Sequence, residues 1–232
     1  MAKRKEKYFF ESINPYWEDL YQKISQSNEK ILLRNDLVKN INGIIITAGL
    51  STRMGKFKPL LKYNGRTFLE NIICKLDLIC NQIIIVTGFN SEKVTEIISA
   101  IEPKIKTKIV IVYNENYNDG MFSSLKVGIE HFNTNWVIYH FVDQPNIPEN
   151  IYLELSNQID ITYDWIQPIN KGRKGHPIIF GKNVISKIKQ SNFDSSLRII
   201  SQSNEIKKYF WECNFEEILS DIDTEQDYLK II

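Results

Sequence analysis

Residues 41–61 read INGIIITAGLSTRMGKFKPLL, and this stretch decides the fold. Its first part, Ile41–Thr47, is a nearly continuous apolar run, which is typical of a strand buried on both faces of a sheet. The loop that follows contains two glycines, three cations and small hydroxyl side chains. Glycine lets the backbone turn tightly with its N–H groups inward, which forms a nest for phosphate oxygens, and Arg53 and Lys58 add positive charge. The stretch predicts a phosphate-binding loop after a buried strand; the alternative is a solvated basic loop.

Strand and helix signals alternate along the rest of the chain. Further strands are expected at Ile83–Thr87, Ile109–Tyr113, Trp136–Val142, Ile161–Gln167 and Pro177–Phe180. Helices are expected at Thr67–Ile79, Glu92–Ile101, Phe122–Phe132 and Ile151–Gln158. Apolar strands separated by helices indicate parallel βαβ units. We therefore predict an α/β domain over residues 41–232, with a Rossmann-like open, mostly parallel sheet covered by helices on both faces. Ligands of such sheets bind beyond the carboxyl ends of the strands.

The first 40 residues have a different pattern. They contain no glycine, and their large apolar side chains recur at helical spacing: Tyr16, Trp17, Leu20, Tyr21 and Ile24. This periodicity predicts one or two amphipathic helices. We interpret residues 1–40 as an N-terminal helical extension outside the α/β domain.

Composition excludes several classes of protein. The chain has 232 residues, of which 43% are apolar and 25% charged, so a globular core can form. A net charge of +1 gives no field that favours nucleic acid or an acidic membrane. No apolar run approaches the roughly 18 residues of a membrane span, and the apolar stretch Tyr8–Phe10 is too short for a signal peptide. We therefore expect a cytoplasmic protein without a membrane or nucleic-acid partner.

The cysteines and two of the histidines carry no predicted chemistry. Cys74, Cys80 and Cys213 match no disulfide or zinc spacing and are expected to be buried free thiols. His131 falls in a predicted helix and His140 in a predicted strand, so both are interpreted as structural.

Two familiar nucleotide-binding motifs are absent from the loop. A Walker A loop has four residues between its glycines and then Lys-Ser/Thr, but here five residues separate Gly49 from Gly55, and Phe57 stands at the hydroxyl position. The G-x-G-x-x-G fingerprint of dinucleotide-binding dehydrogenases is also missing. The loop must bind phosphate in another way.

The loop resembles the signature of a known enzyme family. Gly49-x-x-x-Arg53-Met54-Gly55-x-x-Lys58-Pro59-Leu60-Leu61 is similar to the motif of the nucleotidyltransferases that activate molybdenum cofactor, within the larger group of sugar-phosphate nucleotidyltransferases. Four later segments resemble the family at matching intervals: Asn114-x-x-Tyr117-x-x-Gly120-Met121-Phe122-Ser123-Ser124-Leu125, Val142-Asp143-Gln144-Pro145, Gly175-His176-Pro177 and Asp221-Ile222-Asp223-Thr224. The family usually has glycine at the position of Val142. The resemblance extends over Ile41–Ile232.

The resemblance implies attack by an acceptor phosphate on the α-phosphorus of a nucleoside triphosphate, with release of pyrophosphate and with Mg²⁺ as cofactor. The implied catalytic residues are Arg53, Lys58 and Asp143, with Lys58 near the α-phosphate and Arg53 on the outer phosphates. The implied nucleotide-binding residues are Thr47, Ala48, Gly49, Leu50, Gly55, Lys58, Asn114, Gly120 and Ser123. Asp143 is the implied first metal ligand and Asp223 the second, with Asp221 left open. His176 is placed on the acceptor side.

Local alternatives remain for several of these residues. Asp143 can form an Asx turn. Thr224-Glu225-Gln226-Asp227 has the form of a capping box, which makes the Asp223 segment a helix start. Asn118-Asp119-Gly120 is also a turn signal, Ser123 or Ser124 can cap a helix, and His176 can brace the second half of the domain.

The favoured substrates are CTP and molybdopterin. Ala48 and the Asp143-Gln144-Pro145 turn resemble the cytidylyl branch, whereas guanylyl enzymes tend to have glycine and methionine at the corresponding positions. Alternatives are a sugar or alcohol phosphate as acceptor, or a non-catalytic accessory protein that docks on a molybdenum enzyme through residues 1–40.

Overall fold

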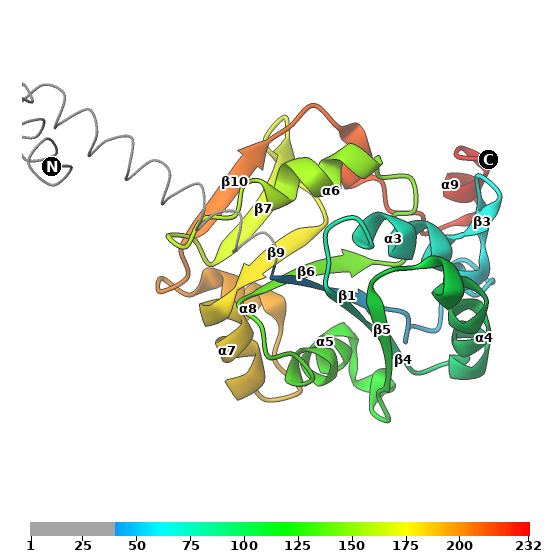
Figure 1. Ribbon diagram of the computed structural model, residues 1–232, viewed down its shortest axis with the longest axis horizontal. Helices are drawn as coiled ribbons and strands as arrows, with labels where there is room; N and C mark the ends of the chain where they lie inside the picture. Colours follow the sequence, from blue (N-terminus) through cyan, green and yellow to red (C-terminus); the bar gives the residue numbers. More distant parts are fainter. Residues whose placement is uncertain (1–39) are drawn as a thin grey trace, which may run out of the picture. The chain divides into compact units, whose positions relative to one another are not determined.

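The computed structural model describes residues 40–232, so the predicted extension at residues 1–40 lies outside the described residues apart from Asn40. An eight-stranded sheet has the order β10-β7-β9-β6-β1-β4-β5, with β8 paired to β7 (Figure 1). The strands are β1 Ile41–Ile46, β4 Gln82–Thr87, β5 Lys108–Tyr113, β6 Trp136–Phe141, β7 Trp165–Asn170, β8 Arg173–Lys174, β9 Ile178–Gly181 and β10 Lys208–Glu212. The neighbours β5, β4, β1 and β6 are parallel, as are β7 and β10, while β9 runs antiparallel to β6 and β7. The predicted mostly parallel α/β sheet is confirmed.

Helices cover both faces of the sheet (Figure 1). One face is covered by α3 Phe68–Leu76, α4 Ser91–Ile101 and α6 Glu149–Ser156. The opposite face is covered by α5 Met121–Glu130, α7 Lys182–Gln190 and α8 Leu197–Gln202. Successive side chains of a strand point to opposite faces of the sheet, so two consecutive residues of β1 show what covers each face. A Cβ on Gly43 would lie 3.1 Å from Leu76 of α3, whereas Ile44 packs against Gly128 of α5. Both faces of β1 are therefore buried, as its apolar run predicts.

Local capping signals fix the start of two helices. Thr67 and Glu70 form a capping box at the start of α3. Thr224 and Asp227 form a second one at α9 Glu225–Leu229, which confirms the helix start at this position. Short 3-10 turns occupy Lys58–Leu60, Glu102–Lys104, Tyr117–Asp119 and Glu216–Leu219.

The strand predicted at Ile161–Gln167 is wrong at its start, because β7 begins only at Trp165. Asp160 forms a turn in which its carboxylate accepts the N–H of Thr162, and Ile161 is 74% exposed. Residues 161–164 therefore precede the strand and do not belong to it. The elements α7, α8 and β10 carry no prediction, although Val184, Ile185 and Ile188 of α7 are buried at helical spacing.

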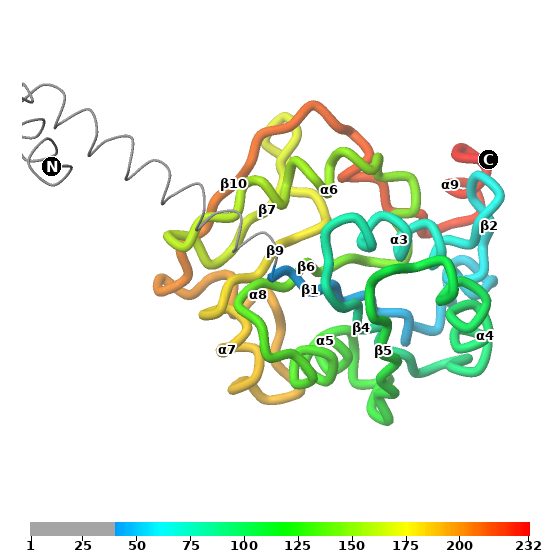
Figure 2. The backbone as a smooth tube through the Cα atoms, in the orientation of Figure 1, coloured from blue at the N-terminus to red at the C-terminus, as the bar shows by residue number. Residues whose placement is uncertain are grey.

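The C-terminal segment packs against the first part of the domain. Tyr228 of α9 donates a hydrogen bond to the carbonyl of Lys62 in β2 Lys62–Tyr63, which forms a hairpin with β3 Arg66–Thr67. Ile222 is buried in a cluster with Met54 and Leu61 from the loop after β1. Figure 2 shows this meeting of the C-terminus with the β2 region. Tyr228 and Lys62 are 166 residues apart in sequence, yet their segments form one unit around the loop.

The strand order indicates where a ligand can bind at the edge of the sheet. The chain runs from β1 outward to β4 and β5, and then returns to the other side of β1 as β6. Such a switch point opens a crevice between the loops that follow the two central strands. The loop after β1 and the turn after β6 should therefore meet there.

Two further expectations concern the cysteines and membrane-spanning helices. Cys80 and Cys213 are buried free thiols as predicted, while Cys74 is only half-buried. Among residues 40–232, no helix has both the length and the apolar character needed to cross a bilayer.

Candidate active site

A pocket of about 380 Å³ opens at the switch point, and we call it the charged pocket. It is lined by Ile46, Thr47, Ala48, Gly49, Leu50, Ser51, Thr52, Arg53, Lys58, Pro59, Tyr117, Asn118, Gly120, Met121, Ser124, Phe141, Val142 and Asp143. The lining comes from the loop after β1, the start of α5 and the turn after β6. These are the segments in which the sequence places the candidate site residues.

The loop after β1 begins as a continuation of the sheet. The N–H of Thr47 donates to the carbonyl of Val86 at 2.9 Å, and the Thr47 hydroxyl donates to the same carbonyl at 3.0 Å. Ser51 has a φ of +53° and Gly55 a φ of +66°, so the tight bends of the loop lie at these residues. Gly49 has no left-handed φ, and a Cβ there would meet nothing within 4 Å. Gly49 therefore contributes openness to the pocket rather than a bend.

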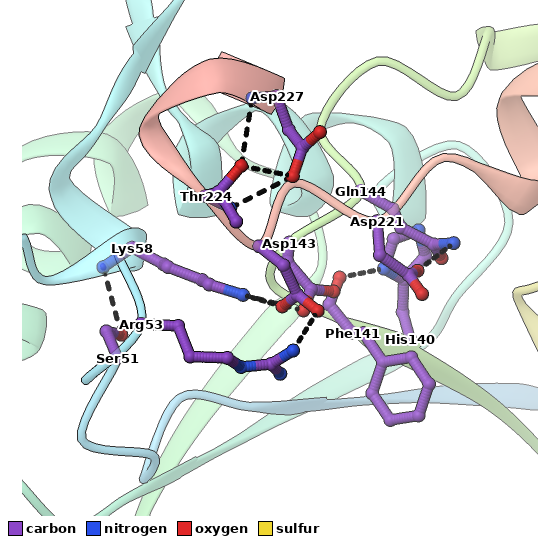
Figure 3. Close-up of polar contacts among 11 residues, drawn as sticks. Ser51, Arg53, Lys58, His140, Phe141, Asp143, Gln144, Asp221, Thr224 and Asp227 are labelled. Atoms are coloured by element: carbon purple, nitrogen blue, oxygen red, sulfur yellow. Dashed lines mark hydrogen bonds and ion pairs between the residues drawn. The ribbon is translucent and has the colours of Figure 1, made fainter. Parts of the chain in front are cut away.

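Lys58 is the centre of the site. Its Nζ lies 3.0 Å from Asp143 Oδ2 and 2.7 Å from Asp223 Oδ1, and its side chain is only 10% exposed. Arg53 Nη1 lies 2.6 Å from Asp223 Oδ2, but the Arg53 side chain is 73% exposed. The backbone N–H of Lys58 donates to the Ser51 hydroxyl at 3.2 Å. Figure 3 shows Lys58 and Arg53 extending together toward the acidic residues.

The two aspartates of the C-terminal segment have opposite pKa shifts. Burial raises the pKa of Asp223, but hydrogen bonds and charge from Lys58 and Arg53 outweigh burial and hold this pKa below its ordinary value. Burial raises the pKa of Asp221, and the negative charges of Asp143 and Asp223 raise it further. Asp223 is therefore the carboxylate that shares a cation with Asp143, whereas Asp221 lies beside them without direct contact to Lys58.

Gln144 ties the turn after β6 to the C-terminal segment. Its amide Nε2 donates to Asp221 Oδ1 at 2.8 Å and to the carbonyl of Ile218 at 3.2 Å. The N–H of Ile222 donates to the carbonyl of Asp143 at 2.9 Å. These bonds hold Asp143 and Asp223 side by side. Gln144 is 1% exposed and does not line the charged pocket.

The carboxylates suit a divalent cation. Asp143 Oδ1 is buried and has no hydrogen-bond partner among the described residues, so this oxygen is free to bind a cation. Among residues 40–232, no group of three or more His, Cys, Asp or Glu side chains forms a metal cluster. Mg²⁺ binds one or two carboxylates and takes its other ligands from phosphate and water. The donor set of Asp143 and Asp223 is compatible with that chemistry.

Asn114 and Ser123 lie behind the pocket wall. Asn114 Nδ2 donates to the hydroxyls of Ser123 and Ser124, and Asn114 Oδ1 accepts from the N–H of Asn116. The Ser123 hydroxyl donates to carbonyls of the loop before α5. In this arrangement both side chains brace the segment that carries Gly120, which has a φ of +97° and lines the pocket.

His140 is structural, as the sequence predicts. Burial lowers its pKa to about 3, so the ring is neutral. Its Nδ1 bonds the Phe141 carbonyl and its Nε2 bonds the Tyr152 hydroxyl, each at 2.6 Å. A carbonyl can only accept, so Nδ1 carries the proton and Nε2 accepts from Tyr152.

A second pocket of about 480 Å³ adjoins the charged pocket, and we call it the aromatic pocket. It is lined by Asp119, Gly120, Met121, Phe122, Leu125, Tyr139, Phe141, Trp165, His176, Ile178, Ser195, Ser196, Leu197, Arg198 and Ser201. Gly120, Met121 and Phe141 line both pockets. His176 lies 4.2 Å from Phe141 between ring centroids, and burial lowers its pKa to about 4. Its Nδ1 is buried without a partner among the described residues.

The structure thus brings together most of the predicted site residues. Thr47, Ala48, Gly49, Leu50, Arg53, Lys58, Gly120 and Asp143 line the charged pocket, and Asp223 joins them through its ion pairs. Gly55, Asn114 and Ser123 do not line it, and His176 lines the aromatic pocket. Sequence reasoning missed the tie made by Gln144 because a contact across more than 70 residues leaves no spacing signal.

Comparison with known proteins agrees with this architecture. The molybdenum cofactor cytidylyltransferase of Escherichia coli is 28% identical over 191 residues, which cover 82% of this chain and 94% of that protein. A probable molybdenum cofactor guanylyltransferase of Bacillus cytotoxicus is 30% identical over 154 residues, covering 65% of this chain and 73% of that protein.

Two solved structures share the fold. A nucleotidyl transferase from Methanothermobacter thermautotroptrophicus superposes with a TM-score of 0.68 at 19% identity, over 83% of this chain and 95% of that one. Rv0371c from Mycobacterium tuberculosis, in a complex with manganese, superposes with a TM-score of 0.60 at 19% identity, over 83% and 97%.

The family model of the MobA-like NTP transferase domain matches residues 43–207, from β1 to the residue before β10. The match contains the loop after β1, the start of α5 and the turn after β6, which together line the charged pocket. The chain belongs to the MobA-like NTP transferase family.

Proposed function

We propose that this protein transfers CMP from CTP to the phosphate of molybdopterin and releases pyrophosphate, with Mg²⁺ as cofactor. The observation that carries the proposal is the position of Lys58 Nζ, which lies between the carboxylates of Asp143 and Asp223 at the glycine-containing loop. Cations and acidic metal ligands at one place are what a reaction between two phosphates needs, because the main barrier is the meeting of two anions.

The reaction balances simply. An oxygen of the acceptor phosphate attacks the α-phosphorus of CTP, a new P–O–P link forms, and the bond from the α-phosphorus to the bridging oxygen breaks. Pyrophosphate leaves with the electron pair of that bond. No group of the protein becomes covalently modified, so the protein acts by positioning and by charge neutralisation.

Lys58 and Arg53 have different tasks in this proposal. Lys58 is nearly buried and held at two points, so its charge is fixed close to the reacting α-phosphate. Arg53 is largely exposed and held only by Asp223, so it can exchange that partner for the outer phosphates of the incoming triphosphate. Backbone N–H groups of the loop around Gly49 supply further donors.

Asp143 and Asp223 would hold the metal. The free Oδ1 of Asp143 and the present pairing of both carboxylates with an ammonium support this assignment. When bound, Mg²⁺ neutralises charge on the triphosphate oxygens. The manganese in the structure of Rv0371c is in keeping with a divalent cation in this fold.

The aromatic pocket is the proposed acceptor site. It adjoins the charged pocket at Gly120, Met121 and Phe141, so an acceptor there can present its phosphate to the nucleotide. Its walls are aromatic, which suits a planar ring system. Arg198, one of its lining residues, is exposed and forms no ion pair with any of the described residues, so it can attract an anionic acceptor.

CTP is the proposed nucleotide because of Ala48. This residue is 2% exposed and lines the charged pocket directly after β1. A methyl group here narrows the space for a base, whereas glycine leaves room for a purine. One methyl in a pocket separates ligands by about 1–3 kcal/mol, so we expect a preference of roughly ten- to a hundredfold and not exclusion of GTP.

The test is a pyrophosphate-release assay. Each of the four nucleoside triphosphates is combined with molybdopterin, a sugar phosphate or an alcohol phosphate, with and without Mg²⁺. We expect release that requires both molybdopterin and metal and is fastest with CTP. Release of pyrophosphate only with a sugar or alcohol phosphate would identify that compound, and not molybdopterin, as the acceptor. No release with any pair of substrates would favour a non-catalytic accessory protein.

A further inference from the structure

Lys75 of α3 is a buried lysine that the reaction proposed above does not use. Its side chain is 7% exposed, and its Nζ donates a short hydrogen bond to the carbonyl of Pro145. It forms no ion pair with any carboxylate of the described residues, and Glu149 acts on it only through space. A buried, unpaired ammonium is costly, because water no longer solvates the charge.

The hydrogen-bond acceptor of Lys75 belongs to the turn that carries Asp143. Pro145 lies in the turn after β6, two residues after Asp143. Gln144 ties this turn from the other side to the C-terminal segment with Asp223. The turn is therefore fixed at two points, by Lys75 from α3 and by the segment that ends at Asp223.

The turn also carries two buried side-chain oxygens that lack hydrogen-bond partners among the described residues, Gln144 Oε1 and Asn146 Oδ1. They flank Pro145, so three oxygens of consecutive residues place their negative ends in the interior. Of these three oxygens, the Pro145 carbonyl is the one that accepts a hydrogen bond from Lys75. Burial also lowers the pKa of Lys75 to about 8, which is the cost of keeping the ammonium there.

We propose that Lys75 is a positioning residue for the metal site: by holding the carbonyl of Pro145, it fixes the turn that carries Asp143 opposite Asp223. This inference rests on the function proposed above. Lys75 touches neither the charged pocket nor its carboxylates, so it acts only through the turn.

The chain contains a matched control. Lys126 of α5 is 6% exposed, and its Nζ also donates a short hydrogen bond to a backbone carbonyl, that of Lys189. Lys126 in addition pairs with Glu130 and lies on the opposite face of the sheet. Replacing either lysine removes a buried ammonium from a backbone carbonyl, but only Lys75 holds the turn after β6.

The experiment compares Lys75→Met, Lys75→Arg and Lys126→Met with the wild-type protein. Binding of Mn²⁺ is followed by the electron paramagnetic resonance signal of the free ion, in the presence of a non-hydrolysable CTP analogue. Melting temperature, kcat and the KM for CTP are measured in parallel. We expect Lys75→Met to weaken Mn²⁺ binding and lower kcat by about 10–100-fold, as is usual when the support of a metal ligand is lost, with the KM for CTP changed less than about threefold. Lys75→Arg should keep most of the Mn²⁺ binding and most of the kcat of the wild-type protein.

Lys126→Met should lower the melting temperature without changing Mn²⁺ binding. Normal Mn²⁺ binding by Lys75→Met, or an equal loss in Lys126→Met, would overturn the proposal. If Lys75→Met does not fold, Lys75→Gln is measured in the same way against the same expectations. Equal Mn²⁺ binding by wild-type protein and Asp143→Asn would instead reject the proposed metal site, and the role of Lys75 with it.

Discussion

The charged pocket and the aromatic pocket share a wall but differ in how they are built. The charged pocket is formed by segments that directly follow the central parallel strands, and Lys58 and Arg53 meet acidic groups there. The aromatic pocket is formed by ring side chains of β6, β7 and the β9 region together with the segment around α8. In the proposed function, charge neutralisation belongs to the charged pocket and acceptor recognition to the aromatic pocket, so variants should separate the two.

The largest expected effect is at Asp143. Asp143→Asn should lower kcat by at least about a hundredfold, because it removes one of the two proposed metal ligands at the point where phosphate charge would develop. Steady-state pyrophosphate release measures this change, and circular dichroism verifies the fold.

The control is Asp227→Asn, since Asp227 bonds Thr224 and Lys230 at the two ends of α9 and does not line the charged pocket. This variant should lose stability and keep turnover. An Asp143→Asn protein with normal activity in Mg²⁺ would remove the proposed metal site.

Lys58→Ala should lower kcat roughly ten- to a hundredfold and weaken CTP binding less, because its fixed charge matters most as the α-phosphate reacts. Its loss also leaves Asp143 and Asp223 unneutralised. Binding titrations beside steady-state rates separate the two effects. Lys56 provides the control, because it lies in the same loop and its one ion pair among the described residues is with exposed Glu225. A Lys58→Ala protein whose sole defect is a raised KM would reject the assigned role.

A substitution in the aromatic pocket should affect the acceptor and leave the nucleotide unaffected. Arg198→Ala should raise the KM for the acceptor by about tenfold, in line with the loss of one charge-assisted contact, and leave the KM for CTP unchanged. The matched control is Lys187→Ala, which removes a cation from the neighbouring helix α7 that pairs with Glu205. Equal changes in both KM values would mean that the two pockets do not divide the substrates.

The smallest expected effect is on the choice of base. Ala48→Gly should reduce the preference for CTP over GTP by about tenfold in kcat/KM, as expected for one methyl group. Competition between CTP and GTP measures it. Gln144→Met should lower turnover without changing the preference, because Gln144 holds Asp221 and Ile218 and does not line the charged pocket. An unchanged preference in Ala48→Gly would show that Ala48 does not contact the base.

The sequence was informative where local signals and long-range structure agree. The apolar run of β1 predicts a buried strand because both of its faces are covered, and Thr67 and Glu70 mark the start of α3 by a local rule. The order of motifs also indicates the binding edge, because parallel strands end together. The charged pocket could therefore be assembled largely from the sequence.

The second half of the domain was less readable for physical reasons. Strand β10 reads KYFWE with partly buried side chains on an edge, so it lacks the continuous apolar run of a central strand. The roles of Gln144 and Lys75 depend on partners about 70 residues away, and no spacing rule reports such contacts. The ion pair between Lys58 and Asp223 likewise joins residues far apart in sequence, although the resemblance already favoured Asp223 over Asp221 as a metal ligand, which stays a prediction.

The most direct test of the central claim follows the label of the nucleotide. Wild-type protein is given molybdopterin, Mg²⁺ and CTP labelled either in the α-phosphate or in the γ-phosphate, and the products are separated. Transfer of the nucleotidyl group predicts that the α-label appears in the acceptor product and the γ-label in pyrophosphate, and that Asp143→Asn loses both signals together. Appearance of the γ-label on the acceptor, or release of pyrophosphate that does not depend on an acceptor, would contradict the account.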